Sequence, residues 1–137
     1  MADLPVLTAL PVLTVCTSCR AGQTLAEGQT PPGRLLHDAL AEALGAHPAP
    51  PLALRGVACM AACSRGCTAA IAAPGKWTYL LGGLGQDQVD DLLTYAAAYA
   101  AHASGALLPS RRPESLRGAV IARLPDLTEP PAKDTAA

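Results

Sequence analysis

Five cysteines in two close-spaced groups are the residues of this sequence whose types and spacing could do chemistry. The first group is Cys16-Thr-Ser-Cys19, and the second, thirty-nine residues further on, is Cys59-Met-Ala-Ala-Cys63-Ser-Arg-Gly-Cys67. Four thiolates gathered from two loops suit either tetrahedral zinc or an iron-sulfur cluster. Zinc knuckles favour two-residue spacers in both groups, whereas the second group here has three-residue spacers. The spacing therefore predicts a metal site and leaves both metals open.

The compartment decides whether such thiols are free, because an oxidising one would make them disulfides. No basic residue precedes Arg20, and Asp3, Pro5 and Pro11 interrupt the first residues, which is unlike the basic and apolar regions of a secretory signal. We therefore predict a cytoplasmic protein with reduced thiols.

Composition argues against several other partners. The chain has 137 residues, 15% of them charged, and a formal net charge of -1. It therefore lacks the excess of basic residues that binding to a phosphate backbone requires. The longest uncharged stretch, residues 92–110, is rich in alanine, and burying alanine in lipid compensates poorly for the transfer of the backbone. We expect neither nucleic acid nor a membrane as a partner.

The remaining polar residues show no catalytic pattern. The three histidines lie outside ligand spacing of any cysteine, and no Ser-His-Asp set or paired carboxylate site stands out. The glycines of 82–85 follow a hairpin rather than opening a phosphate-binding turn. We predict that the chain is not an enzyme.

Alternating strand and helix patterns predict the elements that would position the cysteines. Short β-branched and leucine-rich runs are typical of strands, and apolar residues every three to four positions are typical of helices. In chain order these patterns predict a strand over 10–15, a helix over 34–44, a strand over 52–57, a hairpin of strands over 68–73 and 76–81, and a helix over 87–102.

The helix between the first two strands predicts that they are parallel neighbours. The two cysteine groups then follow neighbouring carboxyl ends of strands, where sites form in α/β proteins. The hairpin extends the sheet and the last helix covers a face. We predict an α/β fold, a thioredoxin-like sandwich of order strand-helix-strand-hairpin-helix.

Residues 1–108 are predicted to form this domain and residues 109–137 a C-terminal extension. Leu116, Val120 and Ile121 share a helical face, which predicts one short helix in 109–124, followed by a flexible tail. The outer edge of the hairpin is a place where two copies can pair into a homodimer, because such edges seek partners.

The second cysteine group belongs to a longer motif that resembles a known family. The segments GVACMAACSRGCTAAI (56–71) and PGKWTY (74–79) resemble the thioredoxin-like 2Fe-2S ferredoxins, in which a Cys-x-x-x-Cys loop, a hairpin and a closing helix follow in the same order. The resemblance covers roughly residues 10–102. The CTSC segment (16–19) is also similar to that of an uncharacterised bacterial family of predicted metal-binding proteins.

The resemblance implies a 2Fe-2S cluster and a protein that carries one electron between protein partners. It makes Cys59 and Cys63 ligands, with Cys16 at the end of the first strand, and Cys19 completes the predicted set of four. Cys67 stays outside this set, as a buried small hydrophobe, an alternative ligand or a thiol that exchanges with a neighbour.

Two other functions stay open on the residues alone. A structural or carrier site for zinc would use the same four thiolates. A C-x2-C thiol-disulfide oxidoreductase is the second alternative. Such enzymes activate the first thiol at a helix N-terminus, but the predicted helix begins more than ten residues after Cys19.

Overall fold

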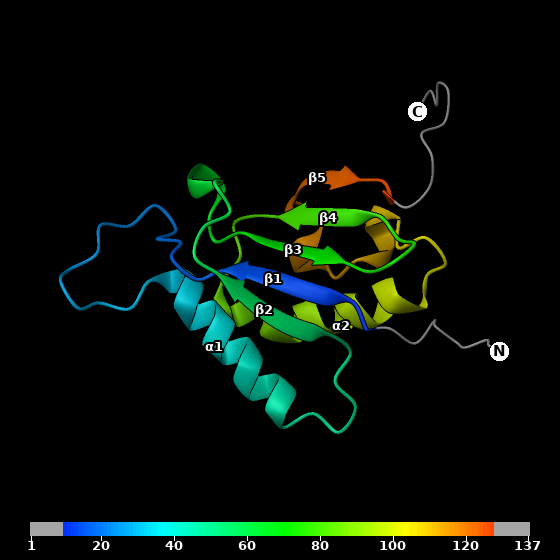
Figure 1. Ribbon diagram of the computed structural model, residues 1–137, viewed down its shortest axis with the longest axis horizontal. Helices are drawn as coiled ribbons and strands as arrows, with labels where there is room; N and C mark the ends of the chain where they lie inside the picture. Colours follow the sequence, from blue (N-terminus) through cyan, green and yellow to red (C-terminus); the bar gives the residue numbers. More distant parts are fainter. Residues whose placement is uncertain (1–9, 128–137) are drawn as a thin grey trace.

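Five strands form one mixed sheet in the computed structural model, which describes residues 10–127 (Figure 1). The spatial order is β2-β1-β3-β4-β5, with β1 and β2 parallel and the other neighbouring pairs antiparallel. The strands are β1 (Val12–Cys16), β2 (Ala53–Val57), β3 (Ala69–Ala72), β4 (Thr78–Leu81) and β5 (Val120–Leu124). The predicted parallel pair and the predicted hairpin are both confirmed.

Two helices connect these strands and contact each other. Helix α1 (Pro32–Gly45) joins β1 to β2 and begins with proline, whose fixed φ suits a first helical turn. Helix α2 (Val89–Ala101) follows a single 3₁₀ turn (Gln86–Gln88) and carries two acidic residues in its first turn, where the helix dipole favours negative charge. Both helices lie where the sequence predicts them.

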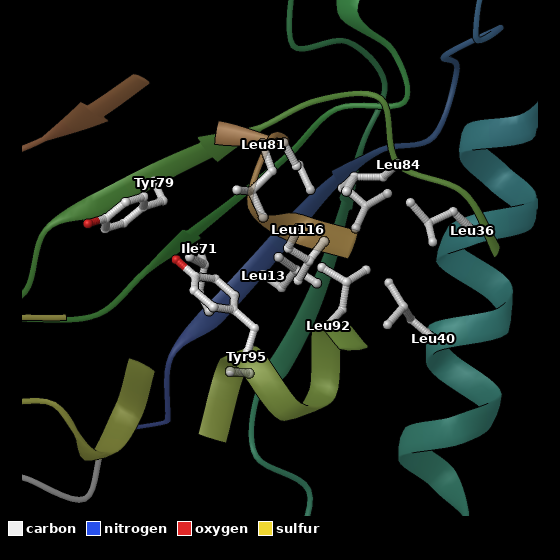
Figure 2. Close-up of a cluster of buried hydrophobic side chains, with 14 of the residues drawn as sticks. Leu13, Leu36, Leu40, Ile71, Tyr79, Leu81, Leu84, Leu92, Tyr95 and Leu116 are labelled. Atoms are coloured by element: carbon white, nitrogen blue, oxygen red, sulfur yellow. The ribbon is translucent and has the colours of Figure 1, made fainter. Parts of the chain in front are cut away.

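The core lies between the sheet and these helices. Burial alternates along the strands, so that Leu13 of β1 and Ile71 of β3 share one face, as expected for a sheet covered on that side. Leucines of α1 and Leu92 and Tyr95 of α2 point at this face (Figure 2). The core contains no phenylalanine, and the tyrosines supply its large side chains.

The structure differs from the prediction at residues 109–124. Two short 3₁₀ helices (Pro109–Arg111 and Glu114–Leu116) lead into β5, and the predicted helix does not continue through Val120 and Ile121, which lie in the strand. The side chain of Leu116 is buried beneath the sheet, and Arg123 stacks over the Trp77 ring at 4.3 Å from its centroid. Pro113 and Gly118 interrupt the apolar spacing that indicated a helix, and pairing with β4 satisfies the backbone groups of the segment instead.

Strand β5 also pairs with the outer edge of β4 and so covers it. The hairpin edge at which a homodimer was predicted is therefore not free, and the sheet ends at β2 and β5 within residues 10–127. Of the predicted flexible tail, residues 128–137 lie outside the described residues. Among the helices of the described part, none has the length and apolar character needed to cross a membrane.

Candidate metal centre

The first cysteine pair sits on a turn that three neighbouring segments hold in place. Cys16 is the last residue of β1, and its N–H donates to the Thr68 carbonyl at 3.0 Å, next to the start of β3. The N–H of Thr17 donates to the Val57 carbonyl at 2.8 Å, at the end of β2, and the Ser18 hydroxyl donates to the Ala58 carbonyl. The carboxyl ends of the two parallel strands therefore meet at this turn, as the topology predicts.

A cavity of about 520 Å³ opens at these strand ends. Its lining includes all four predicted ligands, Cys16, Cys19, Cys59 and Cys63, so the structure brings the two distant groups to one place. Arg20 also lines it, and no histidine or carboxylate of the described residues does. A lining whose metal-binding side chains are all thiols matches the soft ligands that zinc and iron-sulfur clusters prefer.

The two cysteine pairs differ sharply in exposure. Cys16 and Cys19 are 7% and 6% exposed, whereas Cys59 and Cys63 lie exposed on the loop that follows β2. In that loop the N–H of Ala61 donates to the Cys59 sulfur at 3.3 Å. Ala61 has a positive φ of 56°, a conformation that costs energy in a residue with a Cβ.

The sulfurs of the four predicted ligands are not arranged as a metal site in this structure. All five cysteines are free, and within residues 10–127 no three Cys, His, Asp or Glu side chains come close enough together to hold a metal ion. The donor set therefore fits a thiolate-bound metal in chemistry and in placement around one cavity. Ligand geometry requires these sulfurs to come closer together than they lie here.

Helix α1 begins against the first cysteine pair. This proximity was not predicted from the sequence. The N–H of Gly33 donates to the Cys19 carbonyl at 2.9 Å, and a Cβ on Gly33 would lie 2.1 Å from the Cys16 carbonyl oxygen. The loop before α1 folds back, so the start of the helix lies next to Cys19 although it is distant in the sequence. The objection to a thiol-disulfide oxidoreductase, that its helix begins too far from Cys19, is therefore wrong. The positive end of the α1 dipole lies beside these thiols and favours negative charge there.

Cys67 lies behind the first pair and does not line the cavity. Its side chain is 1% exposed, and burial, followed by the neighbouring Cys19 thiol, raises the pKa of Cys67 to about 12. The Cys19 sulfur packs directly on Gly66, where an added Cβ would lie only 1.8 Å from it. The contact between Cys19 and Cys67 depends on how the chain enters β3. It could not be predicted from the spacing of the cysteines in the sequence.

Comparisons with known proteins agree with this architecture. A family model described as "Protein of unknown function (DUF1636)" matches residues 13–126. No curated protein matches the chain. A thioredoxin-like [2Fe-2S] ferredoxin from Aquifex aeolicus is similar in structure, with a TM-score of 0.52 and 17% identity over 92% of this chain and 99% of that one.

A second solved structure, a serine-for-cysteine variant of the thioredoxin-like [2Fe-2S] ferredoxin from Aquifex aeolicus, gives a TM-score of 0.53. It is 19% identical over 82% of this chain and 99% of the ferredoxin. At such identities the likeness concerns the fold. The predicted α/β, thioredoxin-like fold is confirmed.

Proposed function

The chain belongs to the DUF1636 family, and from the chemistry of its site we propose that it is an electron carrier that holds one 2Fe-2S cluster through Cys16, Cys19, Cys59 and Cys63. Such a cluster, when bound, takes up and releases a single electron. The protein would therefore work between two redox partner proteins rather than on a substrate of its own. The observation that carries the proposal is the cavity at the strand ends, which all four thiols line.

The surroundings of the cavity suit a centre of negative charge. The N-terminal end of α1 lies against Cys16 and Cys19, and Arg20 lines the cavity. An N–H already donates to the Cys59 sulfur, and hydrogen bonds to ligand sulfurs are one of the ways in which proteins tune reduction potential. These groups would stabilise four thiolates and the further negative charge of the reduced state.

The two solved structures that share the fold support the same proposal, since both carry the name [2Fe-2S] ferredoxin. The oxidoreductase alternative finds some support in the α1 terminus near the C-x2-C pair. That chemistry would, however, leave Cys59 and Cys63 without a role at the cavity that they line.

Anaerobic reconstitution with iron and sulfide tests the proposal. The full chain should turn brown, contain iron and acid-labile sulfide in equal amounts, and give a paramagnetic resonance signal after one-electron reduction. A colourless product that contains one zinc ion per chain and no sulfide would contradict the proposal and favour the zinc site.

Single serine variants test the ligand set. Cys59→Ser and Cys63→Ser change only exposed side chains of the free protein, so they should fold normally and lose or shift the visible absorption of the reconstituted protein. Cys67→Ala is the control, because Cys67 does not line the cavity and alanine keeps its buried position apolar, and its spectrum should match the wild type. An unchanged spectrum in Cys59→Ser and Cys63→Ser would reject these residues as ligands.

A further inference from the structure

Three thiols, those of Cys16, Cys19 and Cys67, are buried together in the core beside the cavity. The proposed electron carrier uses two of them and gives Cys67 no role. We propose that Cys19 and Cys67 form a reversible disulfide in the metal-free protein. The disulfide itself does not depend on the proposed cluster, although its effect on metal loading does.

The backbone brings the segment of Cys67 next to the first cysteine pair. The N–H of Cys16 donates to the carbonyl of Thr68 at 3.0 Å, and the N–H of Leu84 donates to the carbonyl of Cys67 at 3.1 Å. The residue after Cys67 is thus bonded to the end of β1. After burial, the neighbouring thiols of Cys19 and Cys16 also raise the pKa of the Cys67 thiol, as expected for three thiols close together.

The choice between the two neighbours follows from where their sulfurs lie. The Cys16 sulfur is 3.9 Å from the Ala58 carbonyl oxygen and 3.8 Å from the Ser18 hydroxyl, so it contacts the segments after β1 and β2. The Cys19 sulfur instead packs on Gly66, where a Cβ would come within 1.8 Å of it. Cys19 is therefore in contact with the residue that directly precedes Cys67.

The cavity is the route by which an oxidant would reach this pair, because Cys19 lines it. A small disulfide such as oxidised glutathione would react in two steps. The Cys19 thiolate attacks the small disulfide, forms a mixed disulfide and releases one glutathione thiol. The Cys67 sulfur then attacks the Cys19 sulfur of the mixed disulfide, gives up its proton and releases the second glutathione thiol. Two thiols are oxidised and one small disulfide is reduced.

The disulfide would remove Cys19 from the four proposed ligands. On the proposed function, oxidised protein would therefore not assemble its centre until a thiol reductant restores Cys19. Oxidising conditions would in this way hold the metal-free chain in a state that cannot be loaded.

Tryptic mapping tests the disulfide in the full-length, metal-free protein. Cleavage after Arg20, Arg65 and Lys76 places Cys67 alone in peptide 66–76, and separates it from Cys16 and Cys19 in peptide 1–20. After treatment with oxidised glutathione, unfolding in denaturant with excess alkylating agent to block every remaining thiol, and digestion, mass spectrometry should find peptide 66–76 linked to peptide 1–20. Fragmentation between Cys16 and Cys19 should place the bond on Cys19, and dithiothreitol should release both peptides.

The double variant Cys59→Ser/Cys63→Ser removes the exposed thiols and leaves only the three buried ones to choose among. The same link from Cys67 to Cys19 is expected there. A link between Cys16 and Cys19, a link between Cys16 and Cys67, or a Cys67 that stays fully alkylatable after oxidation would overturn the proposal. Each readout is independent of iron, so a failure of the cluster proposal would leave this test intact.

Discussion

Gly66 leaves no room for a side chain, because the Cys19 sulfur occupies the space where a Cβ would stand. Gly66→Ala must push the sulfur or the backbone aside, and overpacking of this kind typically costs about 1–3 kcal/mol. We expect a lower urea midpoint for the metal-free protein. Gly118→Ala is the matched control, since nothing lies within 4 Å of its Cβ position, and it should stay within about 0.5 kcal/mol of the wild type. Equal effects of the two changes would contradict the packing argument.

Two buried tyrosines of α2 should respond in opposite ways to loss of the hydroxyl, as measured by the free energy of unfolding. The Tyr99 hydroxyl donates to the Trp77 carbonyl, whereas the Tyr95 hydroxyl has no hydrogen-bond partner among residues 10–127. Tyr99→Phe should cost about 0.5–1.5 kcal/mol, the usual net worth of a hydrogen bond. Tyr95→Phe removes a buried group that forms no hydrogen bond and should be neutral or stabilising. Chemical denaturation of both variants checks this pair, and a larger loss in Tyr95→Phe would show that its hydroxyl is bonded in solution.

At the scale of elements, the start of α1 is fitted to the cysteine turn. A Cβ on Gly33 would lie 2.1 Å from the Cys16 carbonyl oxygen, so Gly33→Ala must push the helix away from the turn. We expect a lower thermal midpoint and slower reaction of metal-free protein with iron and sulfide.

Gly45→Ala is the matched control for Gly33→Ala, because it lies in the same helix with open space at its Cβ position. It should be neutral or stabilising by about 0.4–1 kcal/mol, since alanine restricts the unfolded chain more than glycine does. A Gly33→Ala variant as stable as Gly45→Ala would mean that the helix start and the cysteine turn are not tightly packed.

The elements that could be predicted from the sequence are those whose pattern is local. The β3–β4 hairpin is marked by Pro74-Gly75, and α1 by leucines at helical spacing after a proline. Strand β5 could not be predicted in this way, because Val120 pairs with Leu81, almost forty residues earlier, and most of its own side chains are exposed at the sheet edge.

The candidate site likewise has features that the sequence pattern predicts and features that it does not. That Cys16 and Cys59 lie at neighbouring strand ends comes from topology, which the sequence pattern predicts. That α1 begins beside Cys19, and that Cys67 lies behind it, depends on the path of two irregular loops. Such paths are decided by packing over long sequence distances, and the residue types alone do not reveal them.

At the scale of the whole molecule, the three tyrosines join the sheet to α2. The rings of Tyr79, Tyr95 and Tyr99 lie with centroids 6.1–6.5 Å apart, and two of the three pairs are edge-to-face. Burial is the main reason why the pKa of Tyr99 rises to about 12 and why that of Tyr95 also rises above its usual value of 10.0. The folded protein therefore holds these two protons more tightly than the unfolded chain does.

Stability should accordingly depend on alkaline pH. The contribution of these protonated tyrosines is fully present below about pH 10 and is lost as the pH rises through the raised values of the folded state. We expect unfolding to set in above pH 10 together with ionisation of the buried tyrosines, as followed by circular dichroism and tyrosinate absorbance. Tyr99→Phe should reduce this dependence. Ionisation of all three tyrosines near pH 10 in a protein that stays folded would contradict the prediction.

The unequal exposure of the two cysteine pairs gives the site a buried side and an exposed side. Folding alone fixes Cys16 and Cys19 at the junction of β1 and α1, while Cys59 and Cys63 stay on an outer loop. Because no three of these side chains are close enough together in residues 10–127 to hold an ion, part of the binding energy of any ion that all four sulfurs bind must go into drawing them together. Sequence changes in that loop can then adjust how tightly an ion is retained while leaving the rest of the molecule as stable as before.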